Sequence, residues 1–87
     1  MHTTTQLEQA AADQAGAVIA QALNAAAFTC IQNGLANHWR RSAERAMRTS
    51  EALTAQGKKA EAWEWLCIAA GMHARADDAA ALAAATA

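Results

Sequence analysis

Residues 37–75, NHWRRSAERAMRTSEALTAQGKKAEAWEWLCIAAGMHAR, decide the fold, because they place two helical patterns on either side of one glycine. Before Gly57, small and apolar residues recur at alternating steps of four and three: Trp39, Ala43, Ala46, Ser50 and Leu53. This spacing is typical of a helix packed lengthwise against another helix. We therefore predict a helix from Asn37 to Gln56, with Gly57 as its stop, and a further helix from Lys58 to Arg75.

The helix predicted over 58–75 is apolar around most of its circumference. One face, which we expect to point inward, carries Ala62, Leu66, Ala69, Ala70 and His73, with Trp63 at its edge. A second apolar face, about 100° away, carries Trp65, Ile68 and Met72. A helix of this kind must be buried on more than one side. We therefore predict that Trp65, Ile68, Met72 and Trp63 bind another copy or a partner protein. The alternative is that Trp65, Ile68 and Met72 belong to the core of the chain itself.

Helix signals on both sides of this region complete the predicted fold. A first helix begins at the threonines at 3–5, where Thr5 and Glu8 have capping-box spacing, and stops at Asn33-Gly34. A short last helix begins at Asp77 and Asp78, whose carboxylates suit a helix N-terminus. The prediction is a single all-α domain over residues 1–87. It is a small antiparallel bundle of three long helices plus a short C-terminal helix.

The composition supports a helical chain and limits its core. Of 87 residues, 28 are Ala and none is Pro, which favours helix throughout and argues against a β-sheet protein. The apolar fraction of 54% is mostly Ala, so few large side chains are available for burial. Because burial and ordering entropy nearly cancel in so short a chain, we expect a homodimer or a chain that needs a protein partner.

The charges are unevenly distributed although the net charge is only −1. Residues 38–59 contain six basic and two acidic residues, while both flanking segments are acidic. Arg41, Arg45 and Arg48 point away from the apolar row of their helix, and we group them with His38 as the arginine stripe. The stripe predicts contact with an anionic partner, either an acidic protein surface or, as the second possibility, nucleic acid. The alternative is a solvated face that Glu44 and Glu51 partly balance.

No pattern of an enzyme, metal site or membrane span emerges. Cys30 and Cys67 lack metal-ligand spacing, and we expect two free, partly buried thiols in a reducing cytoplasm. His73 and Asp77 have no third ligand nearby in sequence. Residues 14–39 carry no formal charge, but Gln and Asn interrupt the run, so we expect no membrane span and no secretory signal. The expectation is a cytoplasmic protein that is not an enzyme and uses no cofactor, metal or small-molecule substrate.

The run Glu61-Ala62-Trp63-Glu64-Trp65-Leu66, followed by an alanine-rich helix, resembles small phage-encoded helical proteins that disable host machinery. Antiactivators of quorum-sensing regulators and some anti-CRISPR proteins are of this kind. The resemblance implies a non-enzymatic inhibitor, often dimeric, that occludes a surface of its target. We therefore predict an inhibitor or adaptor that binds a partner protein. The alternatives are a nucleic-acid accessory protein that uses the arginine stripe, and a structural subunit of a helical assembly.

Overall fold

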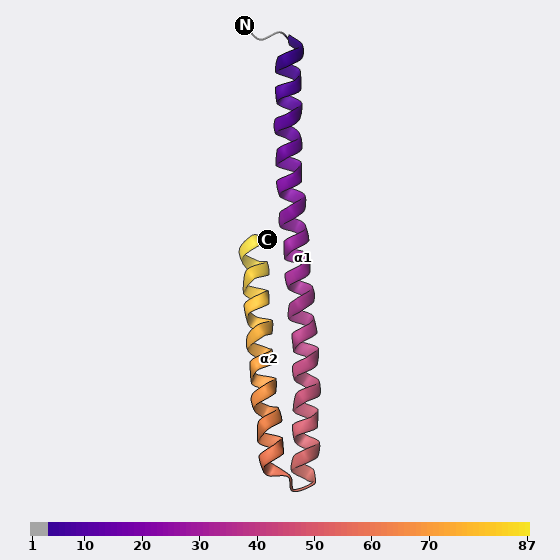
Figure 1. The fold of residues 1–87 in the computed structure, drawn as a ribbon, viewed down its shortest axis with the longest axis vertical. Helices are drawn as coiled ribbons and strands as arrows, with labels where there is room; N and C mark the ends of the chain where they lie inside the picture. The colour runs from indigo at the N-terminus through magenta and orange to yellow at the C-terminus, as the bar shows by residue number, and fades with distance from the viewer. Residues whose placement is uncertain (1–3) are drawn as a thin grey trace.

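The computed structural model describes residues 4–87 as two helices joined by one tight turn (Figure 1). Helix α1 spans Thr4–Ala55 and helix α2 spans Lys59–Thr86. The two helices run antiparallel, and α2 lies only along the C-terminal half of α1, so the N-terminal half of α1 projects alone. The molecule extends 82 × 14 × 13 Å. Its radius of gyration of 23.3 Å is nearly twice the roughly 12 Å of a compact domain of this length.

The structure confirms the all-α class and corrects the predicted architecture. The molecule is an extended hairpin and not a bundle of three long helices plus a short one. Both additional breaks that we predicted are absent, because α1 continues through Asn33-Gly34 and α2 continues through Asp77-Asp78. Helix α1 begins at Thr4, so Thr5 lies inside the helix and is not its N-cap; Thr3 lies outside the described residues.

The turn at Gly57 is where the sequence predicts it. Gly57 has a φ of 79°, a left-handed conformation that glycine adopts without steric cost. The Lys58 N–H donates to the Leu53 carbonyl at 2.9 Å, and the Gly57 N–H donates to the Thr54 carbonyl at 3.0 Å. This pair of bonds is a Schellman motif, which satisfies the last carbonyls of α1 and reverses the chain. Gly34 has no positive φ, so it cannot end α1 in the same way.

A row of small side chains forms the contact between the helices. The buried residues of α1 are Ala36, Ser42, Ala43, Ala46 and Ser50, and those of α2 are Ala62, Ala69, Ala76, Ala79 and Ala83. In α2, Ala62, Ala69, Ala76 and Ala83 recur every seven residues, as do Ala36, Ala43 and Ser50 in α1. We call these two facing rows the seam. Such a heptad repeat keeps one face of each helix against the other, and small side chains let the two backbones approach closely.

Three contacts fix the register of the two helices. Thr29 and Thr86 share a side-chain hydrogen bond of 2.7 Å, and the Ser50 hydroxyl donates to the Ala62 carbonyl at 2.7 Å. The Arg75 guanidinium lies 4.8 Å from the centre of the Trp39 ring. Counted ten residues along each helix from the Thr29–Thr86 contact, this register places Trp39 opposite Ala76, in the same layer of the contact. The Trp39 side chain is therefore faced by an alanine.

The same register explains why the two predicted breaks remain helical. Asn33-Gly34 lies opposite the last turns of α2, and Asp77 lies opposite the part of α1 near Trp39 (Figure 1). On α2, Ala76, Ala79 and Ala83 are at most 6% exposed, so the seam continues past Asp77-Asp78 without interruption. A glycine within a helix costs only about 1 kcal/mol relative to alanine. Burial of a continuous seam outweighs that cost.

Candidate interaction surfaces

The hairpin buries no large side chain. All eight buried apolar residues within residues 4–87 are alanines, while thirteen large apolar side chains are more than a third exposed. The accessible surface is 6435 Å², whereas a compact monomer of this mass exposes about 4,900 Å². The excess of about 1,500 Å² exceeds the ~800 Å² that one partner contributes to a standard protein interface. The molecule therefore exposes more surface than a compact monomer, and thirteen large apolar side chains contribute to that surface.

The apolar face of α2, consisting of Trp65, Ile68 and Met72, is partly open. Trp65 is 38% exposed and Ile68 is 44% exposed, while Met72 is half-buried. Steps of three and four along one continuous helix keep the three side chains on one side of α2. Trp63 is 66% exposed but stands on a different side, because two residues turn a helix by about 200°. The structure thus groups three of the four predicted partner-binding residues and separates Trp63 from them.

The inward face of α2 differs from the predicted one. Of the residues expected to point inward, Ala62 and Ala69 are buried, whereas Leu66, Ala70 and His73 are exposed. The heptad continues to Ala76 and Ala83, so the seam lies on the side of α2 that includes Trp65 and Met72. These two side chains border the seam, and Ile68 is the residue of the apolar face that lies away from the contact between the helices. A partner would therefore contact Ile68 together with the outer edges of its two neighbours.

The arginine stripe is exposed along the outside of α1. His38, Arg41, Arg45 and Arg48 are all exposed, opposite the side that α2 covers. Arg45 donates to the Ser42 hydroxyl at 3.1 Å, and the Arg41 Nε donates to the Asn37 carbonyl at 3.4 Å. These contacts lie within one helix and leave the guanidinium groups facing solvent. The stripe is accessible to an anionic surface, and its role as a contact stays a prediction.

Sequence reasoning missed the cluster around Trp39. Trp39 is half-buried on the seam, as its spacing predicts, but its ring also carries Arg75 at 4.8 Å and meets the His38 ring edge-on at 5.2 Å. A cation over an indole face is attracted by the ring quadrupole. Arg75 lies 36 positions along the chain from Trp39, so only the hairpin register reveals this pair.

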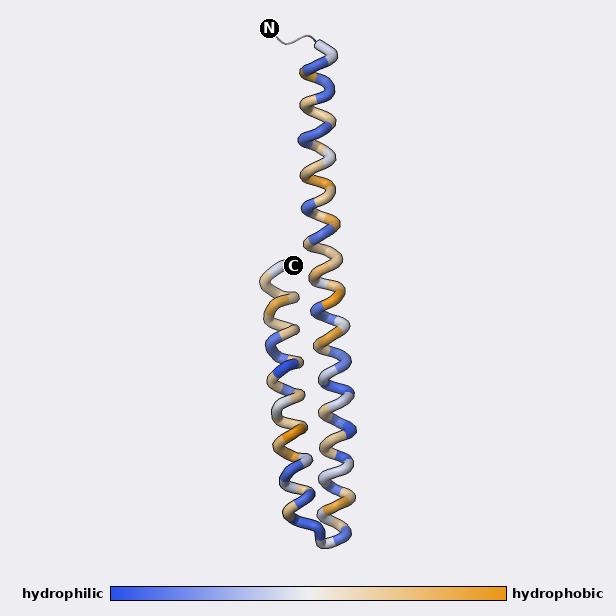
Figure 2. The backbone as a smooth tube through the Cα atoms, viewed as in Figure 1, coloured by the Kyte–Doolittle hydropathy of each residue, from blue (hydrophilic) through white to orange (hydrophobic). Residues whose placement is uncertain are grey.

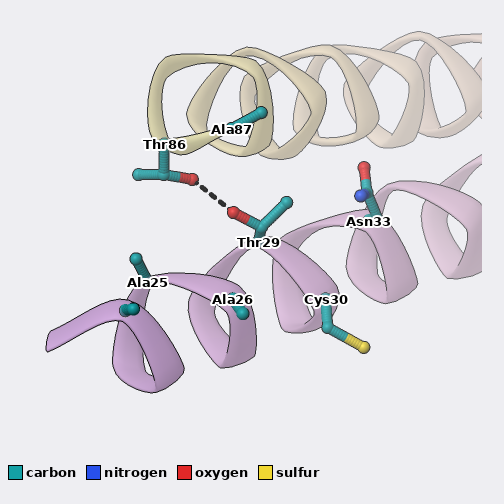
Figure 3. A pocket seen from close by; sticks show the side chains of 8 residues that line it. Ala25, Ala26, Thr29, Cys30, Asn33, Thr86 and Ala87 are labelled. Carbon is teal, nitrogen blue, oxygen red and sulfur yellow. Dashed lines mark hydrogen bonds between the residues drawn. The ribbon is translucent and has the colours of Figure 1, made fainter. Parts of the chain in front are cut away.

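The N-terminal part of α1, residues 4–28, extends beyond the end of α2, and we call it the free segment because α2 does not cover it. Every residue in it is exposed, including Leu7 (58%), Val18 (59%), Ile19 (59%) and Leu23 (64%). Apolar and polar residues alternate along it (Figure 2). It meets α2 at an open notch of about 610 Å³, where Thr29 and Thr86 make their hydrogen bond beside Cys30 (Figure 3). Cys30 and Cys67 are both free and exposed, which corrects the expectation of partly buried thiols.

Helix α1 is also long and apolar enough to cross a membrane by length and composition alone. A window near its N-terminus has a mean hydropathy of 1.3, and none of that window is buried. The expected absence of a membrane span therefore stays a prediction.

Within residues 4–87, no three His, Cys, Asp or Glu side chains gather where they could hold a metal ion. No family model, no curated protein and no solved structure matches this chain.

Proposed function

We propose that this protein is a non-enzymatic protein-interaction module, an inhibitor or adaptor that occludes a surface of a partner protein. One observation carries the proposal: within residues 4–87, thirteen large apolar side chains are more than a third exposed, and every apolar residue that the chain buries is alanine. Association with another protein is the direct way for such a chain to bury these side chains.

The partner-binding surface in this proposal is the apolar face of α2. Tryptophan is enriched at the centres of protein interfaces, and methionine adapts to irregular partners. Trp65 and Met72 are held by the seam on one side, so they present fixed contact area at small entropic cost. The arginine stripe of α1 would orient an acidic partner and speed its encounter.

Site-specific photo-crosslinking in the cells that make the protein tests this proposal. A photoreactive amino acid replaces Ile68 in one variant and Ala74, which is also exposed on α2, in the matched control. We expect light-dependent adducts of one defined other protein from position 68 and none from position 74. The proposal fails if position 68 yields no adduct, only adducts with the chain itself, or the same adducts as position 74.

Charge substitution at the same two positions gives the second measurement. Ile68→Glu places a charge within the apolar face and should abolish binding of the crosslinked partner, whereas Ala74→Glu should leave binding unchanged. Circular dichroism must show equal helicity for both variants. Ile68 is preferred to Trp65 for this purpose, because Trp65 borders the seam and its replacement would also weaken the hairpin. Equal affinity of the Ile68→Glu variant would contradict the proposed surface.

A further inference from the structure

We propose that the free segment of α1 binds the free segment of a second copy in an antiparallel pair, which joins two hairpins end to end. The occupant is a second copy of this chain and not the proposed partner, and the surface is separate from the apolar face of α2. The inference rests on the register of the seam, on the apolar residues beside it, and on charge.

The seam does not stop where α2 ends. Helix α1 is continuous, so the steps of four and three that α2 covers between Thr29 and Leu53 extend toward the N-terminus on the same face. The positions reached are Thr4, Glu8, Ala11, Ala15, Val18, Ala22 and Ala25. Like the covered part, this row is mostly small, but here it has no helix against it. The interface already present between α1 and α2 thus predicts how a second helix would pack on the free segment.

Large apolar side chains lie along this row and beside it. Val18 occupies the row itself, and Leu7 and Ile19 border it on its two sides, all more than half exposed. When small residues bring two helices close together, bordering side chains reach across to the neighbouring helix. A second helix would therefore bury Leu7 and Ile19 together with Val18.

The end of α2 limits the register of the pair. Thr86 occupies the seam opposite Thr29, so a second helix must fit on the N-terminal side of that layer. An arrangement with Ala11 of one copy facing Ala15 of the other meets this condition, because Thr4 of the second copy then faces Ala22. The pairing is symmetric about a two-fold axis near residue 13, so the same patch serves both copies and the assembly closes as a dimer.

The acidic residues favour the antiparallel direction. Glu8 lies on the row, and a parallel pair would place the two Glu8 carboxylates side by side. In the antiparallel pair they are separated by about 15 Å along the axis, at 1.5 Å per residue. That separation exceeds the Debye length of about 8 Å at physiological ionic strength. Asp13 points to the opposite side of the helix and stays in solvent.

The dimer would be a rod about 135 Å long, because two chains of 82 Å overlap by about 27 Å at 1.5 Å per residue, with one hairpin at each end. If the proposed function is correct, the two copies of Ile68 would lie about 100 Å apart, so the dimer would present two distant partner sites. The dimer itself does not depend on that function, because it is measured on the purified chain alone.

Small-angle X-ray scattering and cysteine crosslinking of the purified chain test the proposal. Scattering should give a dimer mass and a maximum dimension near 135 Å, against 82 Å for the single chain. For crosslinking, Cys30 and Cys67 are replaced by Ser, and single cysteines are placed by Ala15→Cys or Ala25→Cys. With a short bis-maleimide, position 15 should yield covalent dimer, because its mates lie about 6 Å apart along the axis. Position 25 should not, because its mates lie about 36 Å apart.

A pair of charge variants tests whether the row that contains Val18 forms the dimer interface. Val18→Glu should reduce the dimer at least tenfold, while Ala20→Glu on the opposite side of α1 should leave it intact, with equal helicity in both. Crosslinking at both 15 and 25 would indicate a parallel pair and overturn the proposal, as would a monomer of 82 Å. A chain that is monomeric in buffer but floats with phosphatidylcholine–phosphatidylglycerol vesicles would assign the free segment to a membrane instead.

Discussion

Enlarging one buried alanine tests whether small side chains on the seam hold the hairpin together. Ala76 is 0% exposed and shares its layer with Trp39, whose indole also carries Arg75. In Ala76→Leu, three additional carbon atoms must fit against that indole. Overpacking of this kind costs about 1–3 kcal/mol, because neighbouring side chains leave their preferred rotamers or the helices separate. Leucine and alanine have similar helix propensities, so the cost reports on packing alone.

The measurement is thermal unfolding by circular dichroism at one fixed protein concentration, since association changes the midpoint. A loss of 1–3 kcal/mol lowers the midpoint by at least about 4 °C in a domain of this size. The control is Ala74→Leu, an identical change on the exposed side of α2. A surface change of under ~0.5 kcal/mol should alter the midpoint by less than about 4 °C. An Ala76→Leu variant as stable as the control would refute the close-packed seam.

Two further pairs of variants test the turn and the contact beside it. Gly57→Ala should destabilise the hairpin by about 1 kcal/mol or more in urea unfolding, because Gly57 has a φ of 79°. Gly34→Ala should instead stabilise the hairpin by about 0.5–1 kcal/mol, because the added Cβ lies in open space. The same sign for both substitutions would contradict the assigned helix end. Ser50→Ala removes the donor to the Ala62 carbonyl and should cost about 1 kcal/mol in the same assay. The control is Ser42→Ala, which removes a hydroxyl that only accepts a hydrogen bond from its own helix and should cost less than half as much. Equal losses would show that the hydrogen bond between the helices is not what stabilises the first turn of α2.

Part of the candidate site followed from the sequence and part did not. The spacing from Trp39 to Leu53 predicted the α1 seam, since a heptad period is visible in one helix alone. The inward face of α2 was misassigned toward Leu66 and His73, because two apolar faces compete in this segment and hydrophobicity does not rank them. Burial of Ala76 and Ala83 decides between the faces, and both residues lie beyond the end of the helix predicted over 58–75.

The sequence by itself determined that the chain is helical, that it reverses at Gly57, and that small residues line the contact. Alanine content, the absence of proline and one left-handed glycine are local properties, so they act without reference to the rest of the fold. Only the tertiary structure decided that Asn33-Gly34 and Asp77-Asp78 remain helical. Each of these local stop signals lies opposite an unbroken stretch of the other helix. Contact with α2 extends to both sides of Asn33-Gly34, where Thr29 is half-buried and Ala36 is buried, and the buried row of α2 runs on both sides of Asp77-Asp78. This packing favours continuing each helix by more than the small cost of one glycine or one acidic pair within it.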